Sequence, residues 1–440
     1  MGRRTAETHR RSRGRRGWAV RGCLLGGVLA CDGTARAQSL TAPSQTVDPE
    51  TAKAALARPL DVPKPTPATG LRFYDGALVV APQLSLSGIS SSNLFQNATG
   101  IADLKAVVAP AVTVALDQGD VGASLVASGR FGRYLLTDAL RQDGYLFGPS
   151  LRARLAEPWT LTTSFQVKRQ AYALSALGTL GAGNVQTFVT TQTSRTALSY
   201  ESGPYFAEFV GQVQAWGQGV EGTGEAAAPA FANRYQRTEF NQIGKVGLRF
   251  FDDATAYLLV AGNRIAYQLA DGYDRDSRGA MVALGLDLPV LDGLRTTGQV
   301  GYLTQRFADP RFNTVGRLVG QATTTWQMSQ DWAWRGYWSR AASELVSPGI
   351  PAITVTSYGT AVTYQVDPAL SLEVRLERLI QAAIQLPITY RGWAVVLGGQ
   401  YLVSERTALE FGYKFQRQKT TDGSQNFREH NLGLGVTMKF

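Results

Sequence analysis

The sequence predicts an all-β fold, a transmembrane antiparallel up-and-down β-barrel of about 18 strands (16–18) around a water-filled lumen. Three observations lead to this prediction. Apolar and polar residues alternate from about residue 77 to the last residue, short and long links alternate between these stretches, and the chain starts with an export signal. The 47 glycines, 17 tyrosines and 18 phenylalanines, with only 18% charged residues, also favour strands and tight turns over helices.

Residues 1–37 form the predicted signal peptide. A long basic stretch precedes a short apolar run at 23–31, and a small-x-small motif ends at Ala37, so the mature chain would begin at Gln38. The apolar run is too short for a spanning helix, which needs about 20 apolar residues. Lipidation of Cys31 is the alternative. We therefore expect export through the inner membrane, cleavage after Ala37 and a final location in the bacterial outer membrane.

Residues 38–70 form a predicted Pro-rich periplasmic linker. The density of proline predicts an extended spacer, and a segment that reaches into the lumen or touches a periplasmic partner is the alternative. The barrel would then comprise residues 71–440. The prolines of the linker are Pro43, Pro49, Pro59, Pro63, Pro65 and Pro67.

The period of two is clear in several stretches. In residues 370–377, Leu and Val alternate with Ser, Glu and Arg, and residues 159–168, 282–288 and 409–416 behave in the same way. Successive side chains of a strand point to opposite faces, so this period predicts strands with one apolar and one polar face. A soluble β-sandwich alternates similarly, so the links between the strands must decide between the two folds.

These links alternate in length. Eight short turns separate nine hairpins, which predicts 18 strands within about two, each long enough for the roughly 9–11 residues of a tilted spanning strand. Short turns on one rim and long loops on the other are typical of bacterial outer-membrane barrels. The short turns lie at 117–120, 157–158, 202–204, 252–253, 291–293, 329–331, 367–368 and 404–406, and longer links at 172–186, 217–234, 270–279, 307–313 and 419–427.

Aromatic residues gather near the predicted strand ends on the apolar face. Amphipathic rings prefer the boundary between membrane and water, so this recurrence supports a spanning barrel. The residues concerned are Trp159, Tyr205, Tyr257, Trp326, Trp332, Trp334, Tyr364, Trp393, Tyr401 and Phe440.

The chain ends on an alternating strand whose last residue is aromatic. This ending resembles the terminal-strand signal that the barrel assembly machinery reads in outer-membrane proteins. The resemblance implies an assembly signal formed by Leu434, Val436, Met438 and Phe440. It also implies the barrel assembly machinery and outer-membrane lipid as partners.

Charge and reactive side chains exclude several functions. The net charge is +10, but residues 1–37 hold nine arginines against two acids and account for +7 of it, so a nucleic-acid partner loses its support. Both cysteines, Cys23 and Cys31, lie in the predicted signal peptide, and His430 is the single histidine beyond it. This removes thiolate metal sites and most His-dependent catalysis. We predict no cofactor, no metal and no enzymatic activity.

Charged residues on the polar faces should line the lumen, since a charge facing lipid costs about 2–4 kcal/mol at mid-bilayer. Twelve basic against five acidic side chains predict a weak preference for anions. The alternative is a neutral lumen whose charges pair and brace the wall, and loop 217–234 is the candidate constriction. Trp216 and Tyr337 are also expected inside. The principal lumen-lining candidates are Arg130, Arg152, Arg154, Lys168, Lys245, Arg249, Arg295, Arg317, Arg335, Glu373, Arg375, Glu377 and Lys414.

Residues 80–95 resemble the first strand and loop of the outer-membrane β-barrel porins that are often described beside exopolysaccharide or capsule loci. In that family a Pro-x-Leu-x-Leu strand leads to an Asn-Leu-Phe tip, and both elements are present here, from Pro82 and from Asn93. Ser92 stands where family members commonly carry Asp, which puts an acid-dependent role of the tip in doubt. The resemblance covers residues 58–440 and implies a pore or a helper in polysaccharide export, without catalytic residues.

Three functional hypotheses remain. The first is a porin-like channel for small hydrophilic solutes, with anions weakly favoured. The second is a barrel accessory to exopolysaccharide or capsule export, whose partner is the polysaccharide. The third is an outer-membrane enzyme that uses His430; paired carboxylates do not support it, because Glu373 and Glu377 would stand roughly 13 Å apart. The solute, gating and the oligomeric state are left open.

Overall fold

The computed structural model of the protein describes residues 70–94, 96, 100–137, 141–171, 186–221, 236–251, 254–268, 272–347, 350–421, 423 and 426–440. The predicted signal peptide and all but the last residue of the predicted linker lie outside these ranges. Within them, no helix is long and apolar enough to cross a membrane.

Nearly all of the described chain is β-strand, as the period of two predicts. A three-residue strand and one 3-10 turn (Tyr74–Gly76) precede eighteen long strands. The strands are β1 (Leu71–Phe73), β2 (Leu78–Ser91), β3 (Asp103–Asp117), β4 (Val121–Tyr134), β5 (Gly144–Ala156), β6 (Trp159–Ala171), β7 (Gln186–Ser202), β8 (Tyr205–Glu221), β9 (Arg237–Phe250), β10 (Ala254–Tyr267), β11 (Ser277–Leu291), β12 (Leu294–Phe307), β13 (Val315–Gln327), β14 (Trp332–Ser347), β15 (Ile350–Gln365), β16 (Leu370–Ala383), β17 (Thr389–Ser404), β18 (Thr407–Thr420) and β19 (Phe427–Lys439).

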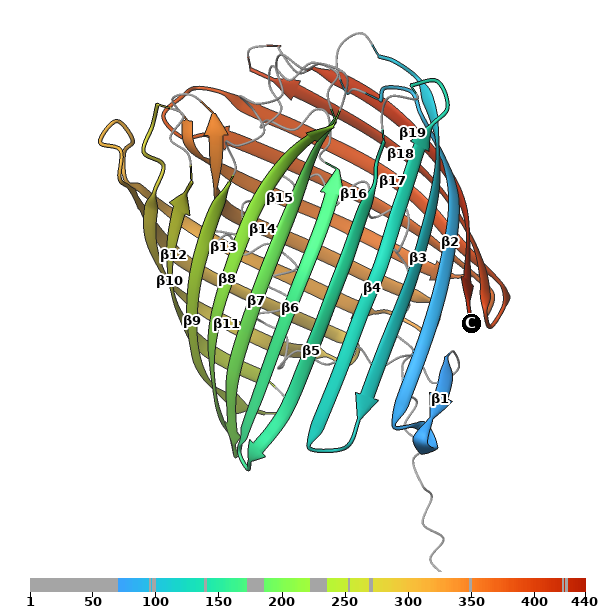
Figure 1. Ribbon diagram of the computed structural model, residues 1–440, viewed down its shortest axis with the longest axis horizontal. Coiled ribbons are helices and arrows are strands. Elements are labelled where there is room, and N and C mark those ends of the chain that lie inside the picture. The colour runs from blue at the N-terminus through green and yellow to red at the C-terminus, as the bar shows by residue number, and fades with distance from the viewer. Residues whose placement is uncertain are drawn as a thin grey trace, which may run out of the picture.

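The strands close into one barrel (Figure 1). Each strand from β2 to β19 pairs antiparallel with its neighbours in sequence, and β19 returns to β2 with the pairs Asn431↔Ser91 and Lys439↔Gln83. The short β1 pairs only with the start of β2. The prediction of an 18-stranded up-and-down barrel is confirmed. Closure leaves no sheet edge in the wall, which a spanning sheet requires because lipid cannot pair with free N–H and C=O groups.

The two rims differ, as expected. One rim, here the turn rim, carries the eight short turns; at one of them Gly293 adopts a φ of 74°, a left-handed conformation that glycine reaches without strain. The other rim, here the loop rim, holds the strand ends between which the longer links run, and these strand ends lie towards the top of Figure 1. Long loops mark the outer side of bacterial barrels, so the loop rim faces the exterior.

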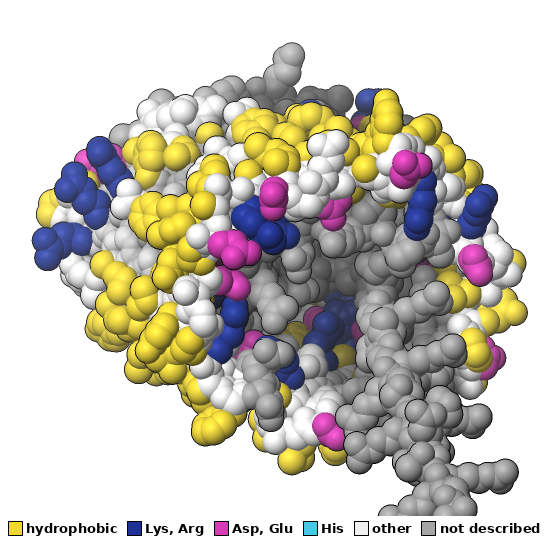
Figure 2. Space-filling view, turned by 90° about the horizontal axis from the view of Figure 1, so that it is seen from below, with side chains coloured by type: hydrophobic (Ala, Val, Ile, Leu, Met, Phe, Trp, Pro, Cys, Tyr) yellow, Lys and Arg dark blue, Asp and Glu magenta, His cyan; other side chains and the backbone are white. Residues whose placement is uncertain are grey.

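The outer face of the wall is apolar. On adjacent strands Val282 pairs with both Val260 and Tyr302, and these side chains are 49–55% exposed, as expected of residues that face lipid. Seen from the turn rim, apolar side chains cover the outer flank, while Lys, Arg, Asp and Glu gather around a hollow inside the wall (Figure 2). The apolar and polar faces therefore separate outside from inside.

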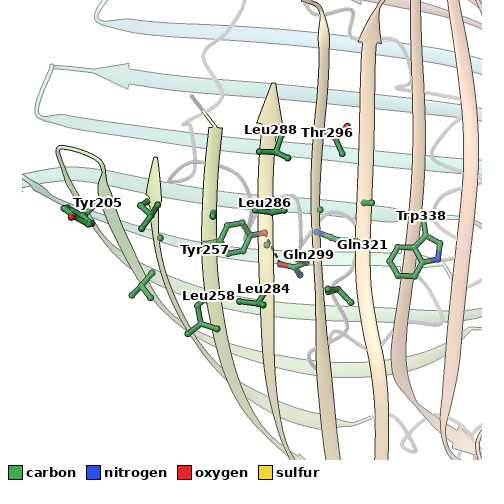
Figure 3. A pocket seen from close by; sticks show the side chains of 18 residues that line it. Tyr205, Tyr257, Leu258, Leu284, Leu286, Leu288, Thr296, Gln299, Gln321 and Trp338 are labelled. Atoms are coloured by element: carbon green, nitrogen blue, oxygen red, sulfur yellow. Dashed lines mark hydrogen bonds between the residues drawn. The ribbon is translucent and has the colours of Figure 1, made fainter. Parts of the chain in front are cut away.

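The prediction for Tyr257 was wrong. We expected it on the outer face, but it faces inward, is 5% exposed and donates a hydrogen bond to Oε1 of Gln299 at 3.2 Å (Figure 3). Its ring crosses the neighbouring Gly285, where an added Cβ would lie 2.0 Å from the ring. Residues 256–261 form a continuous apolar run in which no charged or amide side chain alternates with the apolar ones. The period of two therefore could not determine which residues of β10 face lipid.

Candidate channel interior

All thirteen lumen-lining candidates stand on the inward face in the strand register. Three features set their surroundings: a basic strip on β4–β6, paired charges elsewhere on the wall, and a hairpin that enters the barrel. That these residues set the passage of a solute stays a prediction. Their strands are β4 to β6 for Arg130, Arg152, Arg154 and Lys168; β9 for Lys245 and Arg249; β12 to β14 for Arg295, Arg317 and Arg335; β16 for Glu373, Arg375 and Glu377; and β18 for Lys414.

Four of them form a basic strip, defined as Arg130, Arg152, Arg154 and Lys168. The strip runs along neighbouring strands from the turn rim towards the loop rim. Arg154 lies 3.5 Å from the Asp120 carboxylate, and both side chains are exposed, so this pair is screened by water. Within the described part of β4–β6, the inward face carries no acidic side chain. This section of the wall is therefore positive.

On β7–β12 the inward charges of the described residues pair. Glu208 on β8 lies 3.4 Å from the Arg195 guanidinium and 3.9 Å from Nζ of Lys245, which are its neighbours on β7 and β9. Arg249 pairs with Glu201 at 2.9 Å, and Arg295 binds both carboxylate oxygens of Asp287. Such pairs neutralise and brace the wall of β7–β12.

On β16 one arginine binds two acids of its own strand. The Arg375 guanidinium lies 3.1 Å from Glu373 and 3.2 Å from Glu377, two residues away on either side. All three side chains are largely buried. The triad fits the bracing alternative better than a role in attracting anions.

Sequence reasoning missed a buried ion pair on β9. Nε of Arg237 lies 2.7 Å from Oε1 of Glu239, and the side chains are 2% and 0% exposed. The Arg237 guanidinium also lies 4.6 Å from the Trp216 ring centroid, so this predicted inward Trp packs on a cation. Arg237 and Glu239 occupy the same alternating positions of β9 as the inward Lys245. This alternation is the sequence signal that could have identified them.

The β14–β15 hairpin separates from β13 near the loop rim, while β15 stays paired with β16 up to Ile353↔Ala383. Pairing between β13 and β14 ends at Gly320↔Arg340, although both strands continue, while β14 stays paired with β15 through Glu344↔Ala352. The hairpin tip, defined as 341–344 with 350–353, is buried on both of its faces. A segment of the wall would expose one face to lipid, so the tip has turned into the barrel.

Glu344 attaches the hairpin tip to the facing wall. Its carboxylate accepts hydrogen bonds from the Tyr267 hydroxyl of β10 at 2.9 Å, from the Ser277 hydroxyl of β11 and from the Gln305 amide of β12 at 3.4 Å. The Arg275 guanidinium donates to the backbone oxygen of Ile350 at 3.3 Å. We call the three contacts of Glu344 the latch. The latch joins groups far apart in sequence, so no local pattern could predict it.

An apolar cluster fills the space between the hairpin tip and the wall. Ala342 and Ala352 pack with the inward side chains Leu259, Met281 and Leu303. This part of the lumen is therefore apolar and occupied rather than open to water. We predicted the constriction in loop 217–234, of which residues 222–234 lie outside the described ranges; the inward hairpin is the constriction that the described residues contain.

The links above the hairpin are also joined. Asp309 accepts a hydrogen bond from the backbone N–H of Asp274 at 3.0 Å, which connects the β10–β11 and β12–β13 links. The hydrogen-bonded Arg311 guanidinium holds the pKa of the Asp309 carboxyl well below its usual range. A lowered pKa keeps this group charged through the ordinary titration range of a carboxyl, so the connection persists as the pH falls into that range.

A depression on the outer surface is not part of the lumen. Its volume is about 880 Å³, and the outward side chains of Tyr205, Leu258, Leu284 and Trp338 line it (Figure 3). An apolar hollow at the lipid face suits acyl chains rather than a hydrophilic solute.

His430 lies on the outer face of β19. Its Nδ1 is 2.7 Å from the Tyr413 hydroxyl, and its ring centroid is 4.8 Å from that of Phe415, both on the outer face of β18. This aromatic surrounding is typical of a residue at the membrane boundary. The described residues also contain no group of three or more His, Cys, Asp or Glu side chains that could hold a metal ion.

The predicted assembly signal lies on the strand that closes the barrel. Leu434, Val436 and Met438 share the outer face of β19, where Leu434 is 63% exposed, and the Phe440 N–H donates to the Pro82 oxygen at 3.1 Å. Their reading by the assembly machinery stays a prediction.

The match to a known protein family agrees with this fold. Residues 64–440 match the family described as "Putative beta-barrel porin 2". No curated protein matches the chain in sequence. Among solved structures, the outer membrane protein OpdK of Pseudomonas aeruginosa is 11% identical, covering 82% of this chain and 99% of that chain, with a TM-score of 0.47. The FrpB iron transporter of Neisseria meningitidis is 8% identical, covering 84% and 83%, with a TM-score of 0.48. The siderophore receptor PirA of P. aeruginosa is 7% identical, covering 82% and 80%, with a TM-score of 0.43.

Proposed function

Because this chain belongs to that β-barrel porin family and is an outer-membrane barrel, we propose that it is a channel for small hydrophilic solutes that weakly favours anions. The observation that carries the proposal is the basic strip, which has no inward acid beside it on β4–β6. Charges on a wall of low dielectric focus the field into the water beside them, so the strip raises the local concentration of anions. The charge pairs on β7–β12 add little net field.

Ion selectivity tests this proposal. We expect the purified barrel to give conductance steps in a planar bilayer, with a reversal potential in a KCl gradient that indicates chloride preference. The double variant Arg152→Glu/Lys168→Glu should abolish or reverse this preference, because neither side chain forms an ion pair with a described residue and each substitution changes the local charge by two.

A control variant separates lumen charge from total charge. Arg278→Glu/Arg306→Glu makes the same change on the outer face of β11 and β12 and should leave the reversal potential unaltered. A sealed bilayer would overturn the channel proposal. If deletion of the gene then abolished secreted polysaccharide while small-solute uptake stayed intact, the accessory role in export would replace it.

We further propose that the barrel is not an enzyme. The support is the position of the His430 imidazole, which contacts the Tyr413 hydroxyl and the Phe415 ring on the outer face. The Ser92 hydroxyl accepts a hydrogen bond from the backbone N–H of His430 and not from its ring. His430→Ala should leave conductance and growth unchanged. Any hydrolytic or acyl-transfer activity of the purified protein that this substitution removed would refute the statement.

A further inference from the structure

The charges on the outer face of the barrel differ from those inside. On β2–β19, every charged side chain that the structure describes as facing outward is basic, and all of them stand towards the loop rim. The turn rim instead carries acids such as Asp292, Asp331 and Asp367 in its short turns. This asymmetry matters because the two leaflets of an outer membrane meet different rims.

Three of the outer arginines stand side by side, and we call them the arginine triplet: Arg264, Arg278 and Arg306. Arg278 pairs directly with Arg264 on β10 and with Arg306 on β12, and all three side chains are exposed. Like charges directly opposite each other destabilise a sheet. None of the three forms an ion pair with a described residue, whereas Arg133, also on the outer face, pairs with Asp143. The triplet therefore lacks an anion that would offset its repulsion.

The depth of the triplet indicates which anion fits. Val260, Val282 and Tyr302 lie on the same face, each four positions closer to the turn rim than the arginine of its strand. All three are exposed apolar side chains. Four residues of a strand span about 13 Å. A ligand on this surface must carry acyl chains at the level of the valines and negative charge at the level of the arginines. A guanidinium group can donate two parallel hydrogen bonds to two oxygens of one phosphate, so a phosphate group suits the triplet best.

We propose that the arginine triplet binds the head group of a phosphorylated glycolipid in the outer leaflet. The acyl chains of this lipid would lie on Val260, Val282 and Tyr302. The loop rim faces the exterior, so the outer leaflet supplies the ligand, and the basic charge at this rim with acids at the other selects that leaflet. The site is independent of whether the lumen conducts.

Lipid retention in nanodiscs tests the proposal, with bisphosphorylated lipid A as the probe and dephosphorylated lipid A as its neutral match. We expect the wild-type barrel to retain lipid A over the dephosphorylated form, measured by mass spectrometry of the purified discs. The triple variant Arg264→Gln/Arg278→Gln/Arg306→Gln should retain about a hundredfold less, since each basic residue near an anionic surface contributes about 1 kcal/mol.

Controls keep the result interpretable. Arg152→Gln/Arg154→Gln/Lys168→Gln removes the same charge inside the barrel and should retain lipid A at the wild-type level. If the triple variant does not fold, the single Arg278→Gln variant, which removes the central residue, should show a smaller loss of the same kind. Equal retention of the two lipids by wild type, unchanged retention by a folded triplet variant, or displacement of lipid A by millimolar inorganic phosphate would each overturn the proposal. Conductance plays no part in these readouts, so a sealed bilayer would leave them intact.

Discussion

Replacing Arg237 with methionine is expected to destabilise the barrel by about 3–5 kcal/mol, because it leaves a carboxylate buried without its cation. Nε of Arg237 lies 2.7 Å from Glu239, and the Glu239 side chain is fully buried. The substitution also removes the guanidinium that packs on the Trp216 ring. Equilibrium unfolding in urea from lipid vesicles, followed by circular dichroism, measures the change.

Two further variants show whether the effect comes from the unpaired charge. The double variant Arg237→Met/Glu239→Leu should recover most of the loss, since an apolar pair of similar volume replaces a buried ion pair at little cost. Arg152→Met, which removes an inward arginine outside any described ion pair, should change the free energy of unfolding by no more than about 0.5 kcal/mol. A fall of under about 1 kcal/mol for Arg237→Met would contradict the argument.

The barrel itself could be predicted because most of its strands are polar on one face only. In β16 the outer Leu370, Leu372 and Leu376 alternate with inward charged or hydroxyl side chains, so a single assignment of faces is possible. The same holds for β18. Eight short turns then determine the number of strands, and closure follows from the absence of hydrogen-bonding partners in lipid.

The wall from β10 to β13 shows where this reasoning fails. Its inward face carries Leu259, Met281 and Leu303, which are as apolar as the residues outside. Alternation cannot assign a strand with two apolar faces, and Tyr257 was placed on the wrong side for this reason. An apolar inward face is nevertheless informative, since a strand that is apolar on both faces is buried on both. Here the covering element is the β14–β15 hairpin.

The electrostatics of the lumen could be predicted only in part. The sequence predicts which side chains of a strand face inward. Whether two of them form an ion pair, as Glu208 and Lys245 do, depends on the register between their strands. The latch depends on more, because Glu344 meets Ser277 from 67 residues away only after the hairpin has left β13. Counting charges on predicted faces therefore overestimated the net positive charge. More inward acids than inward bases were absent from the count: the acids Asp103, Asp117, Glu201, Glu239, Glu344 and Glu429 against the bases Lys105, Arg195 and Arg237.

Linking the hairpin tip covalently to the wall is expected to hold the channel in a low-conductance state. The tip has no β-strand partner on its β13 side beyond Arg340, and the latch attaches it to β10–β12. Both natural cysteines precede residue 32, so cysteines at 277 and 344 would be the only thiols of a chain cleaved after Ala37. A short bis-methanethiosulfonate linker between the two cysteines spans the distance that the longer glutamate side chain spans in the native protein. Dithiothreitol removes this linker and leaves a tip without its latch, which should raise the single-channel conductance several-fold in a planar bilayer.

A second cysteine pair tests whether movement of the hairpin is the cause. Gln299 and Gln321 pair directly on β12 and β13 and face inward, so a linker between cysteines at these positions joins two strands that stay together in the wall. This pair should show the same conductance before and after reduction. The hairpin would have no gating role if reduction of the 277/344 pair also left the conductance unchanged, because the apolar contacts of Ala342 and Ala352 would then hold the tip without Glu344. A rise in both pairs would indicate instead that the linker itself obstructs the lumen.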